Sequence, residues 1–256
     1  NAFSSVWTPP DLRPLYGLGN PEPERIIAAW SSFVWDSKRA SLMLYGGGHA
    51  NYRGNDVYAW RASTQMWERA SLPSQMVQDA LGNWRAVDGV DKAPASAHTY
   101  DNNVYLPILD RVLVLGGAAD ANGGHYQTQG ANGQNRVTGP YLFDPSRAHP
   151  DRVGGTTGSH VQRVAPYPEV VGGNMWSNRE SWLNASTTSK PPSEALTNGC
   201  TGYAVENGKD VVYLRSSYRV YRFQISDVAD PATDSWQQVG KYWFGGSGDK
   251  STCGYD

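Results

Sequence analysis

The sequence has few cysteines and histidines and almost no surplus of charge. Its 256 residues include 2 cysteines and 5 histidines, and the formal net charge is −2 at neutral pH. Lysines and arginines are scattered, so there is no basic surface for nucleic acid and no basic amphipathic helix for a membrane surface. No apolar run approaches the roughly 20 residues that a membrane-spanning helix needs. Two cysteines alone do not identify the redox compartment.

Glycine and large aromatic residues are abundant instead. The chain has 28 glycines, 10 tryptophans and 15 tyrosines, and its glycine content exceeds the usual share of about 7%. This mixture suits many short strands joined by glycine turns, with aromatic side chains between sheets. The length fits one large all-β domain or two ordinary domains. Few lysines and abundant tryptophan favour export, so we expect an extracellular or periplasmic protein.

An apolar strand that ends in a glycine cluster occurs twice. Residues 41–45 lead into Gly46-Gly47-Gly48, and residues 111–115 lead into Gly116-Gly117. A second apolar strand follows each cluster, at 57–60 and at 141–143. The pattern predicts a repeated unit of strand, return and strand.

The repeats extend to units of four strands. We expect irregular structure over the proline-rich residues 1–25, then repeated units at about 26–73, 98–165 and 200–240, and the start of a fourth at 251–256. The expected strands of the three complete units are 26–35, 41–45, 57–60 and 66–70, then 98–107, 111–115, 139–144 and 159–164, then 201–205, 211–214, 219–223 and 235–238. Internal repeats of four strands indicate a β-propeller.

Recurrent aromatic markers connect these units to a known family. Aromatic residues recur at the ends of first strands, in third strands as Tyr-x-aromatic, and in fourth strands as tryptophan. The markers are Trp35-Asp36, Tyr100-Asp101, Tyr203-Ala204 and Tyr255-Asp256, then Tyr58-Ala59-Trp60, Tyr141-Leu142-Phe143 and Tyr221-Arg222-Phe223, and then Trp67 and Trp236. With the diglycine, they resemble the kelch-repeat family in its bacterial galactose-oxidase-like propeller form. The second unit lacks the late tryptophan, and the third has Ser216-Ser217 in place of the diglycine.

The resemblance implies an all-β, kelch-type propeller of which about three and a half blades are present. Propellers typically have four to eight blades, and an unpaired sheet edge promotes aggregation. We therefore expect the ring to be completed by a second chain, a missing C-terminal half or a second copy.

The longest predicted connections leave the units at one end. They are residues 74–97, 118–138 and 166–199, and connections longer than about 12–15 residues are usually functional or disordered. We place the functional surface on this long-loop face. The candidate catalytic residues there are His98 or His125 as base, Tyr126 or Tyr52 as acid, and Arg179 as carboxylate clamp. The candidate ligand-binding residues are His49, Tyr52, Arg53, Trp176 and Glu180.

Structural interpretations stand beside these roles. The glycine cluster at 46–48 serves packing and positive φ angles if it does not admit a ligand. His49 and Tyr52 tie down their loop if they do not bind, and His98 caps an inner strand. A metal site of His49, His98, His125 and Cys200 would suit copper or zinc. Alternatively, Cys200 and Cys253 bond to each other.

The sequence leaves more than one class of function open. One is a carbohydrate-active propeller, either lyase-like, with proton abstraction and carboxylate neutralisation, or a copper oxidase. The other is a non-catalytic protein-binding module whose aromatic and arginine side chains form interaction hot spots, or a structural subunit of an extracellular assembly. Whether the chain is an enzyme is not determined by its sequence.

Overall fold

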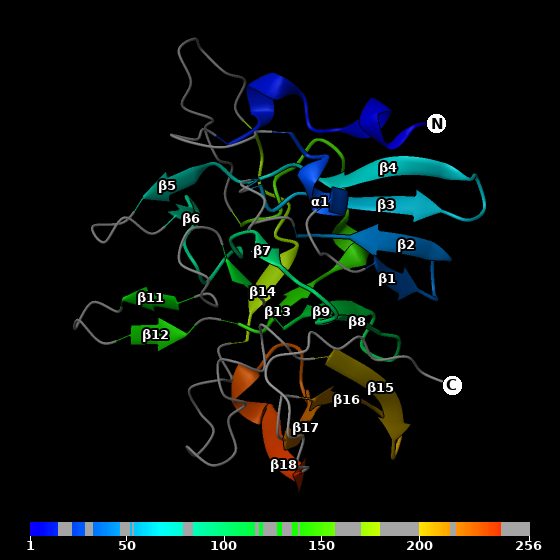
Figure 1. Cartoon of the computed structure of the whole chain (residues 1–256), viewed down its shortest axis with the longest axis vertical. Helices are drawn as coiled ribbons and strands as arrows, with labels where there is room; N and C mark the ends of the chain where they lie inside the picture. Colours follow the sequence, from blue (N-terminus) through cyan, green and yellow to red (C-terminus); the bar gives the residue numbers. More distant parts are fainter. Residues whose placement is uncertain are drawn as a thin grey trace.

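The computed structural model shows an all-β protein. Its described residues form three four-stranded antiparallel sheets and three two-stranded sheets (Figure 1). Helical structure in this part of the chain is limited to α1 (Arg25–Ala28) and the short 3-10 turns η1 (Phe3–Val6), η2 (Pro10–Leu12), η4 (Pro145–Arg147) and η5 (Pro231–Thr233). No described helix has the length and apolar character needed to cross a membrane. The residues described are 1–14, 22–28, 33–46, 52, 54–78, 84–115, 118–119, 127–129, 135–137, 139–156, 170–179, 200–215 and 219–241.

Sheet one is formed by β1 (Phe33–Asp36), β2 (Ser41–Leu44), β3 (Val57–Arg61) and β4 (Met66–Ser71), in that order. The last three strands confirm the prediction. The first strand is shorter than predicted, because Arg25–Ala28 is the helix α1. The carbonyl of Pro23 accepts from the amide of Ile26 in the turn that leads into this helix. Ile26 is buried in one apolar cluster with Leu44, Tyr58 and Tyr52 of the β2–β3 loop.

Sheet two has the order β14-β13-β9-β8 and corrects the prediction at both of its edges. Its strands are β8 (Asn103–Leu106), β9 (Arg111–Val114), β13 (Tyr141–Phe143) and β14 (Trp176–Asn178). The expected first strand at 98–107 is interrupted, because Tyr100 has a positive φ of 48° and the amide of Asn102 donates to the carbonyl of Thr99. The prediction that residues 159–164 form the fourth strand was wrong, because β14 is the fourth strand of this sheet. Residues 159–164 themselves lie outside the described part of the chain.

Sheet three contains β15 (Cys200–Glu206), β16 (Lys209–Arg215), β17 (Arg219–Gln224) and β18 (Ser235–Lys241). All four predicted strands are confirmed. Asn207-Gly208 joins the first two strands, and both residues have positive φ angles, 50° and 74°. Asn-Gly is the preferred sequence for such a two-residue hairpin, because asparagine and glycine tolerate the left-handed conformation.

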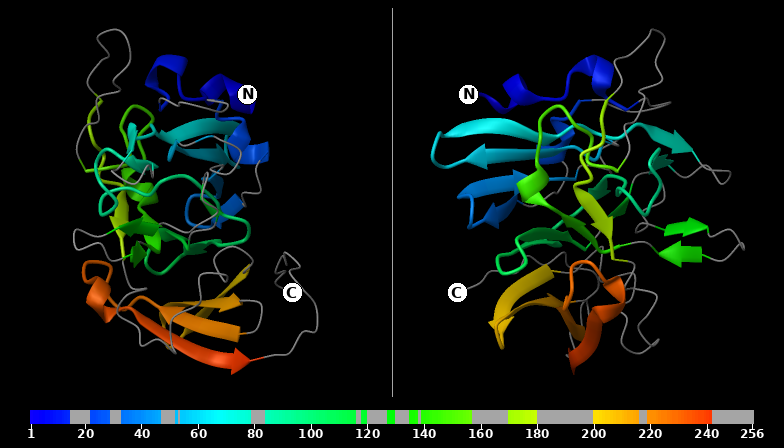
Figure 2. Two further views of the ribbon diagram at one scale, coloured as in Figure 1. Left: turned by 60° about the vertical axis from the view of Figure 1, so that its left-hand side comes forward. Right: turned by 180° about the vertical axis from the view of Figure 1, so that it is seen from behind.

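The short sheets lie within the long connections. β5 (Met76–Gln78) pairs with β6 (Trp84–Ala86), β7 (Ala97–His98) with β10 (Ala118–Ala119), and β11 (Gln127–Gln129) with β12 (Asn135–Val137). The β5–β6 and β11–β12 hairpins project on the same side of the molecule, opposite the β3–β4 turn (Figures 1 and 2). We call these two sides the loop end and the turn end. Two of the three long connections therefore gather at one end, as expected.

The three sheets stack in chain order, with their first strands β1, β8 and β15 side by side (Figures 1 and 2). One apolar cluster fills the first seam, between sheets one and two, and another fills the second seam, between sheets two and three. Representative members are Met43, Ala59, Phe143 and Trp176 in the first, and Leu113, Leu142, Leu214 and Phe223 in the second.

Strand register shows that the sheets repeat one packing pattern. Each sheet has an aromatic front face, which in sheets two and three packs against the preceding sheet, and an opposite back face, which in sheets one and two packs against the following sheet. Five front-face positions are equivalent in all three sheets. They are occupied by Trp35, Leu44, Tyr58, Trp60 and Trp67 in sheet one, Tyr105, Val114, Tyr141, Phe143 and Trp176 in sheet two, and Tyr203, Leu214, Tyr221, Phe223 and Trp236 in sheet three.

This pattern revises two sequence markers. Trp176 is the fourth-strand tryptophan of sheet two, opposite Phe143, as Trp236 is opposite Phe223. The first-strand marker of sheet two is Tyr105-Leu106, and not Tyr100-Asp101 as predicted. The repeat is therefore more regular in the structure than in the sequence.

The N-terminal segment covers part of the front face of sheet one. The ring of Phe3 lies 4.7 Å from that of Trp67 and 5.0 Å from that of Tyr58. The amide of Thr8 donates to the Tyr58 hydroxyl at 2.9 Å, and the Arg69 guanidinium donates to the carbonyls of residues 6 and 7. Residues 1–14 thus form a strap across the outer strands of this sheet.

Candidate functional site

A single segment, Ser96–Asn103, connects all three large sheets toward the loop end. The Ser96 hydroxyl donates to the carbonyl of Gly46, just after β2, at 2.9 Å. The carbonyl of Asn102 accepts from the amide of Leu115 after β9. The carbonyl of Asp101 accepts from the amide and hydroxyl of Thr201 in β15, at 3.1 and 2.8 Å. We call Ser96–Asn103 the junction segment.

The junction segment buries polar side chains that the rest of the described chain does not fully satisfy. Ser96, Thr99, Asn102 and Asn103 are all buried. Within the described part of the chain, the Thr99 hydroxyl and the Asn103 side-chain carbonyl have no hydrogen-bond partner. A buried polar group without a partner costs about 1–3 kcal/mol, and such groups require an explanation, such as a bound molecule or a functional role.

His98 belongs to this junction. It was expected near the axis at the long-loop face, and its backbone pairs with Ala118 in the β7–β10 sheet. The structure describes its backbone only, so its expected roles as base, metal ligand or strand cap stay predictions. The register corrects its relation to Cys200, because the position equivalent to Cys200 is Asn102 and not His98.

Cys200 lies beside the junction segment but does not offer a thiolate. It forms a parallel bridge with Asp101, and its sulfur is in a disulfide. Metal ligation by cysteine requires the deprotonated thiolate, so this geometry favours the alternative in which the cysteines bond covalently. Cys253 lies outside the described residues.

Tyr52 is a buried structural residue and does not line an open site. Its hydroxyl donates to both oxygens of Asp56 at 2.8 Å. The hydroxyls of Thr8 and Tyr58 donate to the same carboxyl at 2.8 and 2.6 Å. Burial nevertheless raises the pKa of Asp56, because desolvation outweighs these hydrogen bonds. The cluster ties the β2–β3 loop and the strap to sheet one, as the structural interpretation of Tyr52 proposed.

Trp176 also belongs to the core and was misplaced in a ligand-binding loop. Its ring lies 5.0 Å from that of Phe143 and 5.1 Å from that of Tyr45, and it is buried in the first seam. Gly154 packs against the indole so closely that a Cβ there would lie 2.5 Å from Nε1. The side chain therefore anchors β14 and does not stack on a ligand.

Arg179 is buried between sheets two and three, where it cannot clamp a substrate carboxylate. It has 1% of its side chain exposed and lies 2.6 Å from Asp234, whose side chain is fully buried. The same guanidinium donates to the carbonyls of Val228, Asp227 and Asp230 in the β17–β18 connection. Its contacts are those of an anchor across the second seam.

The remaining candidates are not brought together by the described structure. Among the described residues, no group of three or more metal-ligating side chains could hold a metal ion. The candidates that lie outside these residues are His49, Arg53, His125, Tyr126 and Glu180.

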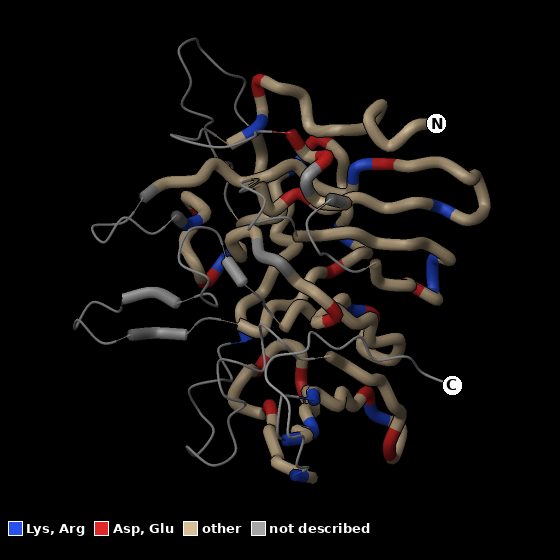
Figure 3. The backbone as a smooth tube through the Cα atoms, viewed as in Figure 1, with Lys and Arg blue, Asp and Glu red and all other residues tan. Residues whose placement is uncertain are grey.

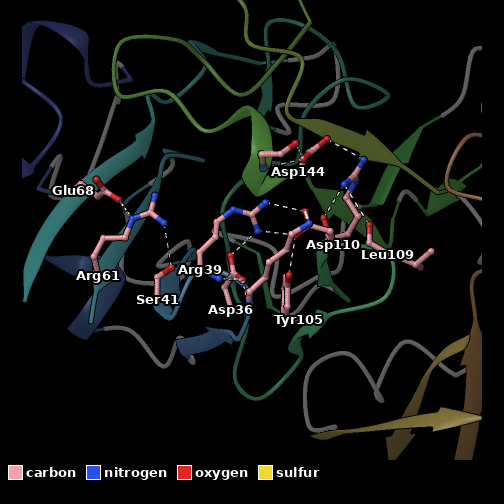
Figure 4. A network of polar contacts seen from close by, with 12 residues as sticks. Asp36, Arg39, Ser41, Arg61, Glu68, Tyr105, Leu109, Asp110 and Asp144 are labelled. Carbon is pink, nitrogen blue, oxygen red and sulfur yellow. Dashed lines mark hydrogen bonds and ion pairs between the residues drawn. The ribbon is translucent and has the colours of Figure 1, made fainter. Parts of the chain in front are cut away.

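A charged network at the turn end was not predicted as a site (Figure 4). Arg39 donates to Asp36 at 2.9 Å and to the two oxygens of Asp110 at 2.6 and 2.9 Å. Lys38 and the hydroxyl of Tyr105 also donate to Asp110, at 2.7 and 2.8 Å. The Arg39 guanidinium holds the pKa of Asp110 well below its usual range. This network joins the β1–β2 turn to sheet two.

The second seam contains an equivalent tyrosine–aspartate pair, which binds different partners. Asp210 follows the first turn of sheet three and accepts from the Tyr203 hydroxyl at 2.7 Å, as Asp110 accepts from Tyr105. It also accepts from the backbone amides of Ile108 and Leu109 in the β8–β9 turn, at 3.3 and 2.8 Å. In each seam, a tyrosine–aspartate pair of one sheet therefore binds the first turn of the preceding sheet. Figure 3 places acidic and basic residues along these turns.

The fold and junction define a protein of stacked, repeated four-stranded antiparallel sheets with a polar centre toward the loop end. No protein-family model matches the chain, and no curated protein matches it.

Proposed function

We propose that the chain is a kelch-type β-propeller that binds a ligand at its loop end. The equivalent front faces, the neighbouring first strands and the fourth-strand tryptophans support the propeller. The described residues form three four-stranded sheets, fewer than the four to eight of typical propellers. The proposed ring therefore includes sheets from a second chain, a C-terminal continuation or a second copy.

We propose that the ligand is a neutral carbohydrate and that the protein is exported. The observation that carries this proposal is the junction segment, where the Thr99 hydroxyl has no partner among the described residues, close to the backbone contacts that join the three sheets. Hydroxyl and amide groups both donate and accept hydrogen bonds, which suits the hydroxyls of a sugar. Abundant tryptophan and tyrosine supply apolar surfaces with a polar edge.

Binding without turnover agrees better with the described residues than catalysis does. The lyase hypothesis used Arg179 to neutralise a carboxylate, and this side chain is buried against Asp234. The copper-oxidase hypothesis required a cysteine at the metal, and Cys200 is in a disulfide. The protein-binding module is the alternative non-catalytic class, and it would place the ligand surface on the loops and not at the junction.

Binding of the full chain to a panel of neutral and acidic polysaccharides tests the proposal by affinity electrophoresis and calorimetry. We expect His98→Ala and Thr99→Val to weaken binding of a neutral polysaccharide by about tenfold or more, which corresponds to about 1.4 kcal/mol. The matched control is His149→Ala, because His149 is exposed beyond β13, away from the junction segment.

The same panel contains the outcomes that would overturn the proposal. Absence of binding to every polysaccharide, or equal binding by His98→Ala, Thr99→Val and the unmodified chain, would remove the junction as a carbohydrate site. Product formation from an acidic polysaccharide that His98→Ala abolishes would show a lyase instead.

A further inference from the structure

A buried carboxyl, that of Asp56, lies beneath the strap. Hydroxyls from three segments donate to it: Thr8 of the strap at 2.8 Å, Tyr52 of the β2–β3 loop at 2.8 Å and Tyr58 of β3 at 2.6 Å. The amide of Thr8 also donates to the Tyr58 hydroxyl at 2.9 Å. Asp56 and Thr8 each have 0% exposure. Docking of the strap therefore helps to remove this carboxyl from water.

Asp56 differs from other buried carboxyls because no cation bonds to it within the described part of the chain. Asp36 lies 2.9 Å from the Arg39 guanidinium, and Asp234 lies 2.6 Å from that of Arg179. The side chains that bond to Asp56 carry hydroxyls alone. These donors stabilise the carboxylate less than the water that burial removes, so burial raises the pKa of Asp56.

Two arginines beside this cluster bond to the backbone of the strap. Arg13 donates to the carbonyl of Thr8 at 2.8 Å and pairs with Glu22 at 3.1 Å. Arg69 on β4 donates to two further carbonyls of the strap. Both cations thus hold the strap in place without neutralising the carboxyl beneath it.

The titratable groups that contact Asp56 directly are the hydroxyls of Tyr52 and Tyr58. Tyrosine ordinarily titrates near pH 10, and burial raises the pKa of Tyr58 well above its ordinary value. Below about pH 9 these hydroxyls keep their protons. Asp56 is therefore the member of the cluster that changes charge between acid and weakly alkaline pH.

From this arrangement we propose that docking of the strap is linked to a proton on Asp56: the neutral acid holds the strap at Thr8, and ionisation releases it. The docked state shields the carboxyl and binds the proton more tightly than the undocked state, in which water reaches the carboxylate. By linkage, docking is most favourable at acid pH, near or below the ordinary aspartate pKa of about 4. It weakens as the pH rises through the higher pKa of the docked state.

Release of the strap uncovers aromatic surface on sheet one. The ring of Phe3 lies 4.7 Å from that of Trp67 and 5.0 Å from that of Tyr58. The side-chain amide of Asn1 exchanges two hydrogen bonds with the backbone of Trp67, at 2.7 and 2.9 Å. These contacts involve aromatic rings and an uncharged amide, so the pH dependence enters at Thr8. The strap thus acts as a pH-sensitive cover for β3 and β4.

Hydrogen exchange of residues 1–14 in the full chain, measured by mass spectrometry from about pH 5 to pH 9, tests the proposal. The side chain created by Asp56→Asn is neutral at every pH, so this variant provides the reference rate. The rate in the unmodified chain, divided by that in Asp56→Asn at the same pH, should rise by up to about tenfold per pH unit until the docked-state pKa is passed. The matched control is Asp11→Asn, which removes an exposed carboxyl of the strap itself and should behave like the unmodified chain. A ratio that stays constant or falls as the pH rises would overturn the proposal.

The converse measurement leaves the buried cluster intact. Linkage is reciprocal, so a change that loosens the strap must lower the pKa of Asp56. Phe3→Ala removes the ring that packs on sheet one, and it should speed exchange of the strap while Asp56 titrates at a lower pH in carbon-13 NMR spectra of its carboxyl. Faster exchange with an unchanged pKa, in a variant that circular dichroism shows to be folded, would contradict the link between the proton and the strap.

Discussion

In both seams, a tyrosine–aspartate pair belongs to the following sheet, but the groups that it binds in the preceding sheet differ. In the first seam, Asp110 binds the charged side chains of Lys38 and Arg39. In the second, Asp210 binds two backbone amides. The difference follows from the β1–β2 and β8–β9 turns, because the former carries cations and the latter presents amide groups.

The contacts between the outer strands also differ between the two seams. In the first seam, backbone hydrogen bonds connect β4 to the chain after β13, with the Leu72 amide donating to the carbonyl of Arg152 and the His149 amide to that of Ala70. In the second, the buried pair Arg179–Asp234 connects β14 to the β17–β18 connection. Both seams therefore contain charged contacts, but the Arg179–Asp234 pair of the second seam is buried. This burial predicts how the two seams respond to mutation and salt.

The largest expected effect comes from the buried charge of the second seam. Arg179→Met should lower the free energy of unfolding by about 3–5 kcal/mol, because it leaves the Asp234 carboxylate buried without its cation. Urea denaturation measures the change. Arg147→Met is the control, since Arg147 pairs with Asp144 but is half exposed, and exposed pairs contribute about 0–1 kcal/mol. A loss at Arg179 no larger than at Arg147 would contradict an anchoring role.

The next largest effects on the free energy of unfolding are expected at Asp210 and Asp110. The response of these effects to salt should differ between the two seams. Asp210→Ala removes the acceptor of two amides and a hydroxyl, and should cost about 2–3 kcal/mol. Asp110→Ala should cost about 1–2 kcal/mol at low salt and less at 1 M salt, where the Debye length falls to about 3 Å. Unfolding in urea at both ionic strengths measures the four values. An equal response to salt at both sites would contradict the assigned difference.

These anchors show where sequence reasoning succeeded and where it failed. The third strand of each large sheet was predicted correctly. These strands contain Tyr58, Tyr141 and Tyr221, and each is a short apolar segment bounded by turns. Trp176 was missed as the partner of Phe143, since a long connection separates the two residues and local spacing carries no signal. The burial of Arg179 depends on Asp234 in another sheet.

Prediction of the site was limited for the same reason, because contacts between distant segments leave no local signal in the sequence. The sequence correctly indicated the end at which two long connections, 74–97 and 118–138, emerge, because strand order determines where each loop leaves a sheet. The third predicted connection, 166–199, instead contains β14. It did not reveal that Cys200 is equivalent to Asn102, because this depends on strand register, or that Tyr52 is bound to Asp56, because this depends on the burial of their loop. A repeated tyrosine before each first turn and an aspartate after it, as in Tyr105–Asp110 and Tyr203–Asp210, was the available signal for the seams.

The smallest expected effect is a pH dependence confined to the first seam. The Arg39 guanidinium holds the pKa of Asp110 below its usual range, so the folded protein binds this proton more weakly than the unfolded chain, whose pKa is about 4. The stabilisation is therefore fully present above about pH 5 and is lost as pH falls toward the folded pKa. The difference in unfolding free energy between the unmodified chain and Asp110→Asn should shrink from neutral pH to about pH 2. If Arg39 is the main cause, this trend should be much weaker in an Arg39→Gln background, and an unchanged trend there would assign it to another partner of Asp110.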